Sequence, residues 1–129
     1  MKSIILDTNA YTGLVNGNAK VLEYMAAADI VYISTVVLGE LYAGFYGGNK
    51  FEWNSNILHE LLEKEPIKII DVSHNTSVIF GKLKNELKKK ATMVPINDIW
   101  IAAHALETSS ALVTFDKHFK DISGLTVLD

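Results

Sequence analysis

Short apolar runs, separated by segments of helical periodicity, constrain the fold of this chain more than any other feature. The runs lie at Ser3–Leu6, Ile30–Ile33, Ile67–Ile70, Ala111–Thr114 and Thr126–Leu128. Their apolar side chains are mostly consecutive and do not alternate strictly with polar ones. That pattern is typical of strands covered on both faces in a parallel sheet.

The segments between these runs are expected to be helices. Asn18, Ser34 and Ser73 are short polar residues that suit the N-cap position, where a side-chain oxygen accepts a backbone hydrogen bond. The expected helices cover residues 18–28, 34–46, 51–64, 73–90 and 98–108. Strands that alternate with helices predict an α/β fold, in which helices flank a central, mainly parallel sheet.

Length and composition favour one domain over residues 1–129. A chain of 129 residues is close to the commonest domain size, and no repeat or Pro/Gly/Ser-rich linker divides it.

The net charge is −3 and all 12 basic residues are lysine, so overall charge does not indicate a nucleic-acid binder. The absence of cysteine excludes disulfides, thiolate metal sites and a cysteine nucleophile, and fits a cytoplasmic location.

We expect no membrane association. The most membrane-like stretch, residues 30–48, contains Glu40 and directly follows Asp29. A carboxylate in the middle of a bilayer is costly, so a buried element of a globular protein is the better interpretation. The apolar run at the start of the chain ends at Asp7 and is too short for a secretory signal.

Four acidic residues occupy positions that suit a ligand site. Asp7 follows the first predicted strand and Asp116 follows the fourth, so both are expected at the carboxyl edge of the sheet, where α/β proteins bind ligands. Glu40 lies in a helix that is otherwise apolar, and ionised carboxylates are rarely buried without a partner. Asp98 lies where the last long helix is expected to begin.

Each acid also has a simpler explanation. Asp7 can cap a helix, Asp98 can favour a helix dipole, and Asp116 can belong to a turn. Glu40 can face solvent on an amphipathic helix. The occurrence of all four at such positions favours a common site.

Four short segments resemble, in order, the motifs of PIN domains, and in particular those of VapC-type toxins from bacterial and archaeal toxin–antitoxin pairs. The segments are LDTN at 6–9, GEL at 39–41, NDIWIAAHAL at 97–106 and LVTFD at 112–116. The resemblance covers essentially the whole chain. It implies a three-layer sandwich of helices around a central, mainly parallel β-sheet, and endonucleolytic cleavage of RNA that depends on Mg²⁺ or Mn²⁺. It also implies a VapB-like antitoxin as partner and a homodimer.

The same resemblance assigns roles to individual residues. The catalytic and metal-binding cluster it implies consists of Asp7, Glu40, Asp98 and Asp116. Asn9 and Thr114 match polar positions that usually support this cluster. The chain departs from the pattern at Phe115, where many relatives have arginine, and near His118, where many have a further acid. His118 has two interpretations, an adventitious metal ligand or a surface residue, and we prefer the second.

Elementary electrostatics explains why such a cluster needs a cation. Two carboxylates about 4 Å apart repel each other by roughly 4 kcal/mol at an effective dielectric constant of about 20. Mg²⁺ and Mn²⁺ prefer oxygen ligands, and a bound cation can activate water for attack on a phosphodiester. The carboxylates then act as ligands or as bases that orient water.

Other functions fit the chain less well. A phosphatase of the haloacid-dehalogenase kind needs a second aspartate where Asn9 stands. A phosphate-accepting signalling domain of the receiver kind needs a lysine at the end of its last strand, where this chain has Val127, Leu128 and Asp129. A degenerate PIN domain could serve as an RNA-binding scaffold, although all four acids are present.

The aromatic stretch from Tyr42 to Trp53 has two interpretations. Core packing is the leading one, because each aromatic ring can bury a large apolar area. The alternative is a groove that accepts a helix of a partner protein.

Overall fold

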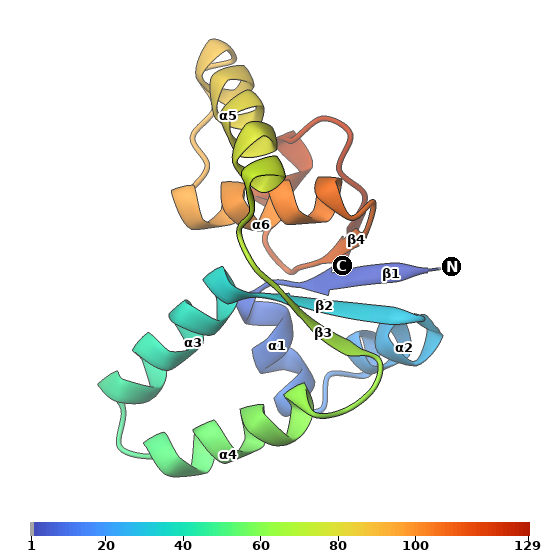
Figure 1. Ribbon diagram of the computed structural model, residues 1–129, viewed down its shortest axis with the longest axis vertical. Coiled ribbons are helices and arrows are strands. Elements are labelled where there is room, and N and C mark those ends of the chain that lie inside the picture. The colour runs from blue at the N-terminus through green and yellow to red at the C-terminus, as the bar shows by residue number, and fades with distance from the viewer. Residues whose placement is uncertain (1) are drawn as a thin grey trace.

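The computed structural model describes residues 2–129 and contains a five-stranded sheet in which every pair of neighbouring strands is parallel (Figure 1). The strands are β1 (Ser3–Leu6), β2 (Ile30–Ser34), β3 (Ile67–Ile70), β4 (Ala111–Val113) and β5 (Val127–Leu128). They lie in the order β3-β2-β1-β4-β5. The predicted strands are confirmed, with small differences at their ends.

Helices cover both faces of the sheet, which confirms the three-layer prediction. They are α1 (Thr8–Val15), α2 (Ala19–Ala27), α3 (Thr35–Gly47), α4 (Phe51–Leu62), α5 (His74–Lys89) and α6 (Ile96–Glu107), and a 3₁₀ helix covers Lys117–Asp121. In Figure 1, α5 and α6 lie on one side of the sheet and α1 and α2 on the other, while α3 and α4 form a hairpin at the side.

Two apolar cores follow from the alternation of side chains along the strands. Ile4 and Leu6 pack with Val21 of α2 in one cluster, whereas Ile5 packs with Ile101 of α6 in the other. Ala102 and Ala105 of α6 are fully buried, which lets this helix approach the sheet closely. None of the helices within residues 2–129 combines the length and the apolar character needed to cross a membrane.

The three predicted N-caps are confirmed. Asn18 accepts a hydrogen bond from the backbone of Val21, and Ser34 accepts one from Val36. Ser73 and Thr76 form a reciprocal capping box at the start of α5. These contacts join residues only a few positions apart, which is why the sequence alone predicts them.

The first helix, α1, was not predicted. Its sequence, TNAYTGLV, is rich in poor helix formers, and the expected helices begin at residue 18, although Asp7 was given as a possible helix cap. Asp7 caps the helix by accepting a hydrogen bond from the Ala10 backbone at 2.8 Å, and Ala10 and Tyr11 are buried. Capping and burial therefore outweigh weak intrinsic propensity.

A fully buried histidine joins α6 to the ends of two strands. The Nε2–H of His104 donates to the Asp71 carbonyl at 3.2 Å, and the Ser34 hydroxyl lies 3.0 Å from Nδ1. Because the Asp71 carbonyl can only accept, Nδ1 is free to accept from Ser34 when the ring is neutral. Burial lowers the pKa of His104 below its usual value of 6.5.

This lowered pKa predicts a loss of stability in mild acid. The unfolded chain takes up a proton on His104 more readily than the folded chain, so the free energy of unfolding falls as pH drops below about 6.5. Urea unfolding of the parent and of His104→Gln between about pH 8 and pH 5 measures this contribution. The difference in unfolding free energy between the two proteins should shrink toward acid pH, and a constant difference would contradict the role of His104.

Candidate active site

The order in which the chain adds strands to the sheet reverses between β1 and β4. The chain proceeds from β1 outward to β2 and β3, and then returns to place β4 and β5 on the other side of β1. Ligand sites of α/β proteins form at such a reversal of strand order. Leu6 pairs with Val113 there, so the residues that follow these strands meet at one edge.

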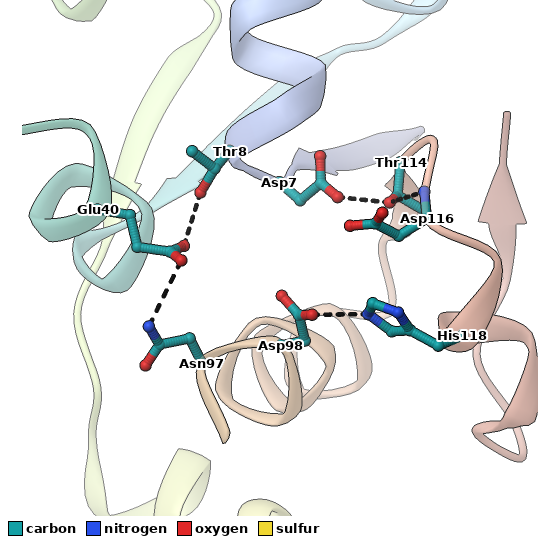
Figure 2. A network of polar contacts seen from close by, with 8 residues as sticks. All are labelled: Asp7, Thr8, Glu40, Asn97, Asp98, Thr114, Asp116 and His118. Carbon is teal, nitrogen blue, oxygen red and sulfur yellow. Dashed lines mark hydrogen bonds and ion pairs between the residues drawn. The ribbon is translucent and has the colours of Figure 1, made fainter. Parts of the chain in front are cut away.

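Thr114 ties together the two acids that follow these strands. Its hydroxyl donates to Asp7 Oδ2 and accepts a hydrogen bond from the Asp116 backbone at 3.0 Å (Figure 2). Asp7 and Thr114 are buried and Asp116 is half-buried. The supporting role expected of Thr114 thus takes the form of a direct contact with Asp7.

Two helices bring the other acids to the same edge. Asp98 lies in the first turn of α6, which begins at Ile96 and therefore slightly before the expected start. Glu40 lies within α3, and its carboxylate accepts hydrogen bonds from Thr8 Oγ1 at 2.6 Å and from Asn97 Nδ2 at 3.4 Å (Figure 2). These bonds direct Glu40 inward and not into open solvent.

The four predicted acids line one cleft of about 560 Å³. In Figure 2 the carboxylates of Glu40, Asp98 and Asp116 point toward a common space beside Asp7, and Asn9 also lines the cleft. The full lining consists of Asp7, Thr8, Asn9, Glu40, Pro95, Ile96, Asn97, Asp98 and Asp116. The structure thus brings together residues that are far apart in the sequence, while their catalytic role stays a prediction.

The interpretation of His118 as a surface residue holds only in part, because the partly exposed ring contacts Asp98. Its Nε2 lies 2.6 Å from Asp98 Oδ2, and its side chain is 31% exposed against 17% for Asp98. The contact joins the 3₁₀ helix to α6 beside the acidic cluster (Figure 2). The available signal in the sequence was its place two residues after Asp116, where the chain departs from the PIN pattern.

Burial and mutual repulsion make the acidic cluster costly when it is ionised. Burial raises the pKa of Asp7, and the charges of Asp116 and Asp98 raise it further, against hydrogen bonds from Thr114 and Ala10. Burial likewise raises the pKa of Asp98, with Asp116 and Glu40 adding to the rise and His118 opposing it. Such a cluster favours a bound cation or a proton.

The simpler explanations do not account for the set. Asp7 does cap α1, but its second oxygen is held by Thr114. Asp116 stands at the N-cap of the 3₁₀ helix without a side-chain capping bond. Asp98 lies in the first turn of α6, where its charge favours the helix dipole. Local structure therefore accounts for one oxygen of Asp7 and for the position of Asp98, and leaves the convergence of the four acids unexplained.

A second cleft of similar size, about 570 Å³, lies at the opposite edge of the sheet. Its lining is made of apolar, glycine and hydroxyl-bearing residues with Lys2, and contains no carboxylate or imidazole side chain. Chemistry therefore selects the acidic cleft as the candidate active site.

The PIN domain family matches residues 4–125. The chain belongs to the PIN-domain family. It is 34% identical to ribonuclease VapC2 of Rickettsia felis over 126 residues, an alignment that covers 94% of this chain and 92% of that protein.

Solved PIN structures share the fold over almost the full chain. One is the crystal structure of VapBC2 from Rickettsia felis bound to a promoter DNA fragment, with a TM-score of 0.86 and 32% sequence identity. The match covers 98% of this chain and 97% of the matched chain. The structure of VapBC-1 from nontypeable Haemophilus influenzae matches with a TM-score of 0.88 and 28% identity, with the same coverage. PIN membership leaves the phosphatase and receiver interpretations without support.

Neutralising one acid of this PIN domain should stabilise it when metal is absent. Asparagine can keep the capping oxygen of Asp7 while removing its charge, and the raised pKa of Asp7 means that ionisation opposes folding at neutral pH. We expect Asp7→Asn to melt a few degrees higher in EDTA, since about 1 kcal/mol shifts the melting temperature of a domain of this size by roughly 4 °C.

The pH dependence provides the check on this stabilisation. The advantage of Asp7→Asn should disappear as acid protonates Asp7 in the parent. The surface variant Asp121→Asn serves as control, because Asp121 is exposed and does not line the cleft. A metal-free Asp7→Asn protein that is clearly less stable than the parent at neutral pH would contradict this role of the Asp7 charge.

Proposed function

We propose that this chain is a metal-dependent endoribonuclease and the toxin of a VapBC-type toxin–antitoxin pair. The observation that carries the proposal is the convergence of Asp7, Glu40, Asp98 and Asp116 in one cleft of a PIN domain. The curated relatives are named as VapC ribonucleases, and both structures described above are of VapBC.

The donor set fits a hard divalent cation. The four acids offer carboxylate oxygens, which Mg²⁺ and Mn²⁺ prefer, and the cleft lining contains no lysine to balance their charge. The chain has no arginine at all. Asp7, Glu40, Asp98 and Asp116 are therefore the residues that would hold Mg²⁺ or Mn²⁺.

The chain's own residues would order the reactants. A bound divalent cation supplies a more acidic water, a contact to the scissile phosphate and stabilisation of the leaving oxygen. Thr8 and Asn97 hold the Glu40 carboxylate in place, and Thr114 holds Asp7, so the acids are oriented before substrate arrives. A carboxylate oxygen that is free of these bonds can accept a proton from the attacking water.

RNA is the proposed substrate because of the relatives' names, and the proposed place of action is the cytoplasm. A catalytically inactive RNA-binding scaffold is the alternative. Retention of all four acids in one cleft favours the nuclease, since a scaffold has no need to keep mutually repelling buried carboxylates.

A VapB-like antitoxin is the proposed partner, and the hairpin of α3 and α4 offers a surface for it. The aromatic stretch is divided: Tyr42 and Phe45 pack against the core and Phe51 stacks on Tyr46, while Tyr46 is 75% and Trp53 68% exposed. Core packing therefore holds for Tyr42 and Phe45, and a surface for a partner helix stays a prediction that the exposed Tyr46 and Trp53 support. A homodimer, which the resemblance implies, stays a prediction.

The nuclease proposal predicts RNA cleavage that requires both the cation and the acids. EDTA should abolish cleavage of total RNA by the purified chain, and Mg²⁺ or Mn²⁺ should restore it. Asp7→Asn and Glu40→Gln should stay folded and lose at least about 100-fold in rate, because each removes one charged ligand. A cleavage assay with mapping of the cut ends, run beside melting curves, measures both effects.

Matched variants separate the site from general acidity. Asp121→Asn and Glu60→Gln carry the same chemical changes at exposed positions outside the cleft and should cleave at the parental rate. Parental cleavage by Asp7→Asn, or full activity after exhaustive chelation, would refute the proposed mechanism. A chain that binds RNA without cutting it would instead favour the scaffold.

The toxin proposal predicts growth arrest that a small co-encoded protein relieves. Tyr46→Ser combined with Trp53→Ser should weaken the complex with that protein by about tenfold or more, since exposed aromatic residues often dominate interfaces. RNA cleavage by the free variant should be unchanged. Pull-down and growth assays measure these effects, with Leu22→Ser on α2 as an exposed apolar control. Unimpaired growth and no co-purifying partner would contradict the toxin role.

A further inference from the structure

His118 is the one imidazole beside the acidic cluster. Its Nε2, a carboxylate oxygen of Asp98 and one of Asp116 all lie within 4.8 Å of one another. Among residues 2–129 this is the one group of three such side chains close enough to share a metal ion. Figure 2 shows the ring directed from the 3₁₀ helix toward Asp98.

The position of His118 is fixed by its neighbours on both sides. Phe119 is fully buried in the main core and anchors the 3₁₀ helix. Asp116, at the start of this helix, is held through its backbone N–H by Thr114, which also contacts Asp7. The imidazole therefore belongs to the same rigid unit as two of the acids.

We propose that His118 is itself a metal ligand, beside Asp98 and Asp116, and that it gives this site a preference for Mn²⁺ over Mg²⁺. The inference rests on the proposed metal-dependent nuclease function and specifies which side chains bind the ion. Asp7 and Glu40 complete the cluster from the other side of the cleft.

The contact between His118 and Asp98 is compatible with this role. Without metal, Nε2–H can donate to Asp98 Oδ2, which spares Asp98 part of the cost of its burial. As a ligand, the ring is neutral with its proton on Nδ1, and the Nε2 lone pair faces the cation. The hydrogen bond between His118 and Asp98 is then replaced by one bond from each side chain to the same ion.

The nature of the ligand atom gives the selectivity. Mg²⁺ strongly favours oxygen and keeps its waters, so a nitrogen ligand adds little to its binding. Mn²⁺ suits carboxylate oxygen, but as a member of the divalent transition-metal series it also accepts a nitrogen ligand more readily than Mg²⁺ does. An all-carboxylate cluster would lack this added contribution to selectivity.

The decisive experiment detects nitrogen bound to the metal. The full chain is stripped with EDTA and loaded with Mn²⁺ alone, and electron spin-echo modulation records coupling to nitrogen, with and without histidine labelled with heavy nitrogen. We expect a nitrogen coupling that shifts on labelling and is lost in His118→Gln. The control His74→Gln, at an exposed position on α5, should retain it.

Calorimetry measures the selectivity. His118→Gln should weaken Mn²⁺ binding by about tenfold or more and change Mg²⁺ binding much less. Melting curves show whether the variant is folded. If the variant is unfolded, the labelled parent still tests whether a histidine nitrogen binds the metal. Equal losses for both ions would overturn the selectivity.

The outcomes distinguish this inference from the proposed function. Mn²⁺ binding and metal-dependent RNA cleavage without any nitrogen coupling would overturn the His118 ligand and leave the nuclease intact, with His118 only positioning Asp98. Failure of the parent to bind Mn²⁺ at all would overturn both.

Discussion

The parallel pairing of β1 with β4 is the contact on which the candidate site depends. It places Leu6 beside Val113, so that Asp7 and Thr114 follow adjacent strands at one edge of the sheet. The chain passes through α6 before it enters β4, which lies on the side of β1 opposite β2. Helix α6 carries Asp98 to the same edge of the sheet. One topological reversal therefore assembles side chains from both ends of the sequence.

This assembly places like charges together, and the surrounding polar groups determine how they are tolerated. Thr8, Asn97, Thr114 and His118 each contact one of the carboxylates. The bonds orient the acids without neutralising them, and burial still raises the pKa of Asp7 and Asp98. The cleft is consequently suited to a cation, because a cation relieves the remaining repulsion between the carboxylates.

Features that depend on neighbours in the sequence were predictable. The caps Asn18, Ser34 and Ser73 act over a few residues, and the apolar runs identify the strands directly. Helix α1 was not predicted, because its local propensity is poor and its stability comes from the burial of Ala10 and Tyr11. The start of α6 was placed slightly late for a related reason, since no side-chain cap marks it.

By itself, the sequence determined the α/β class, the positions of Asp7, Asp98 and Asp116 at element ends and of Glu40 in an apolar helix, and the order of motifs that resembles PIN domains. Only the tertiary structure decided which polar groups contact those acids. His118 and Asp98 are 20 residues apart, and Thr8 and Glu40 are 32 apart. No local pattern encodes such pairs, because they arise only when strand pairing and the packing of helices on the sheet bring separate elements to one edge.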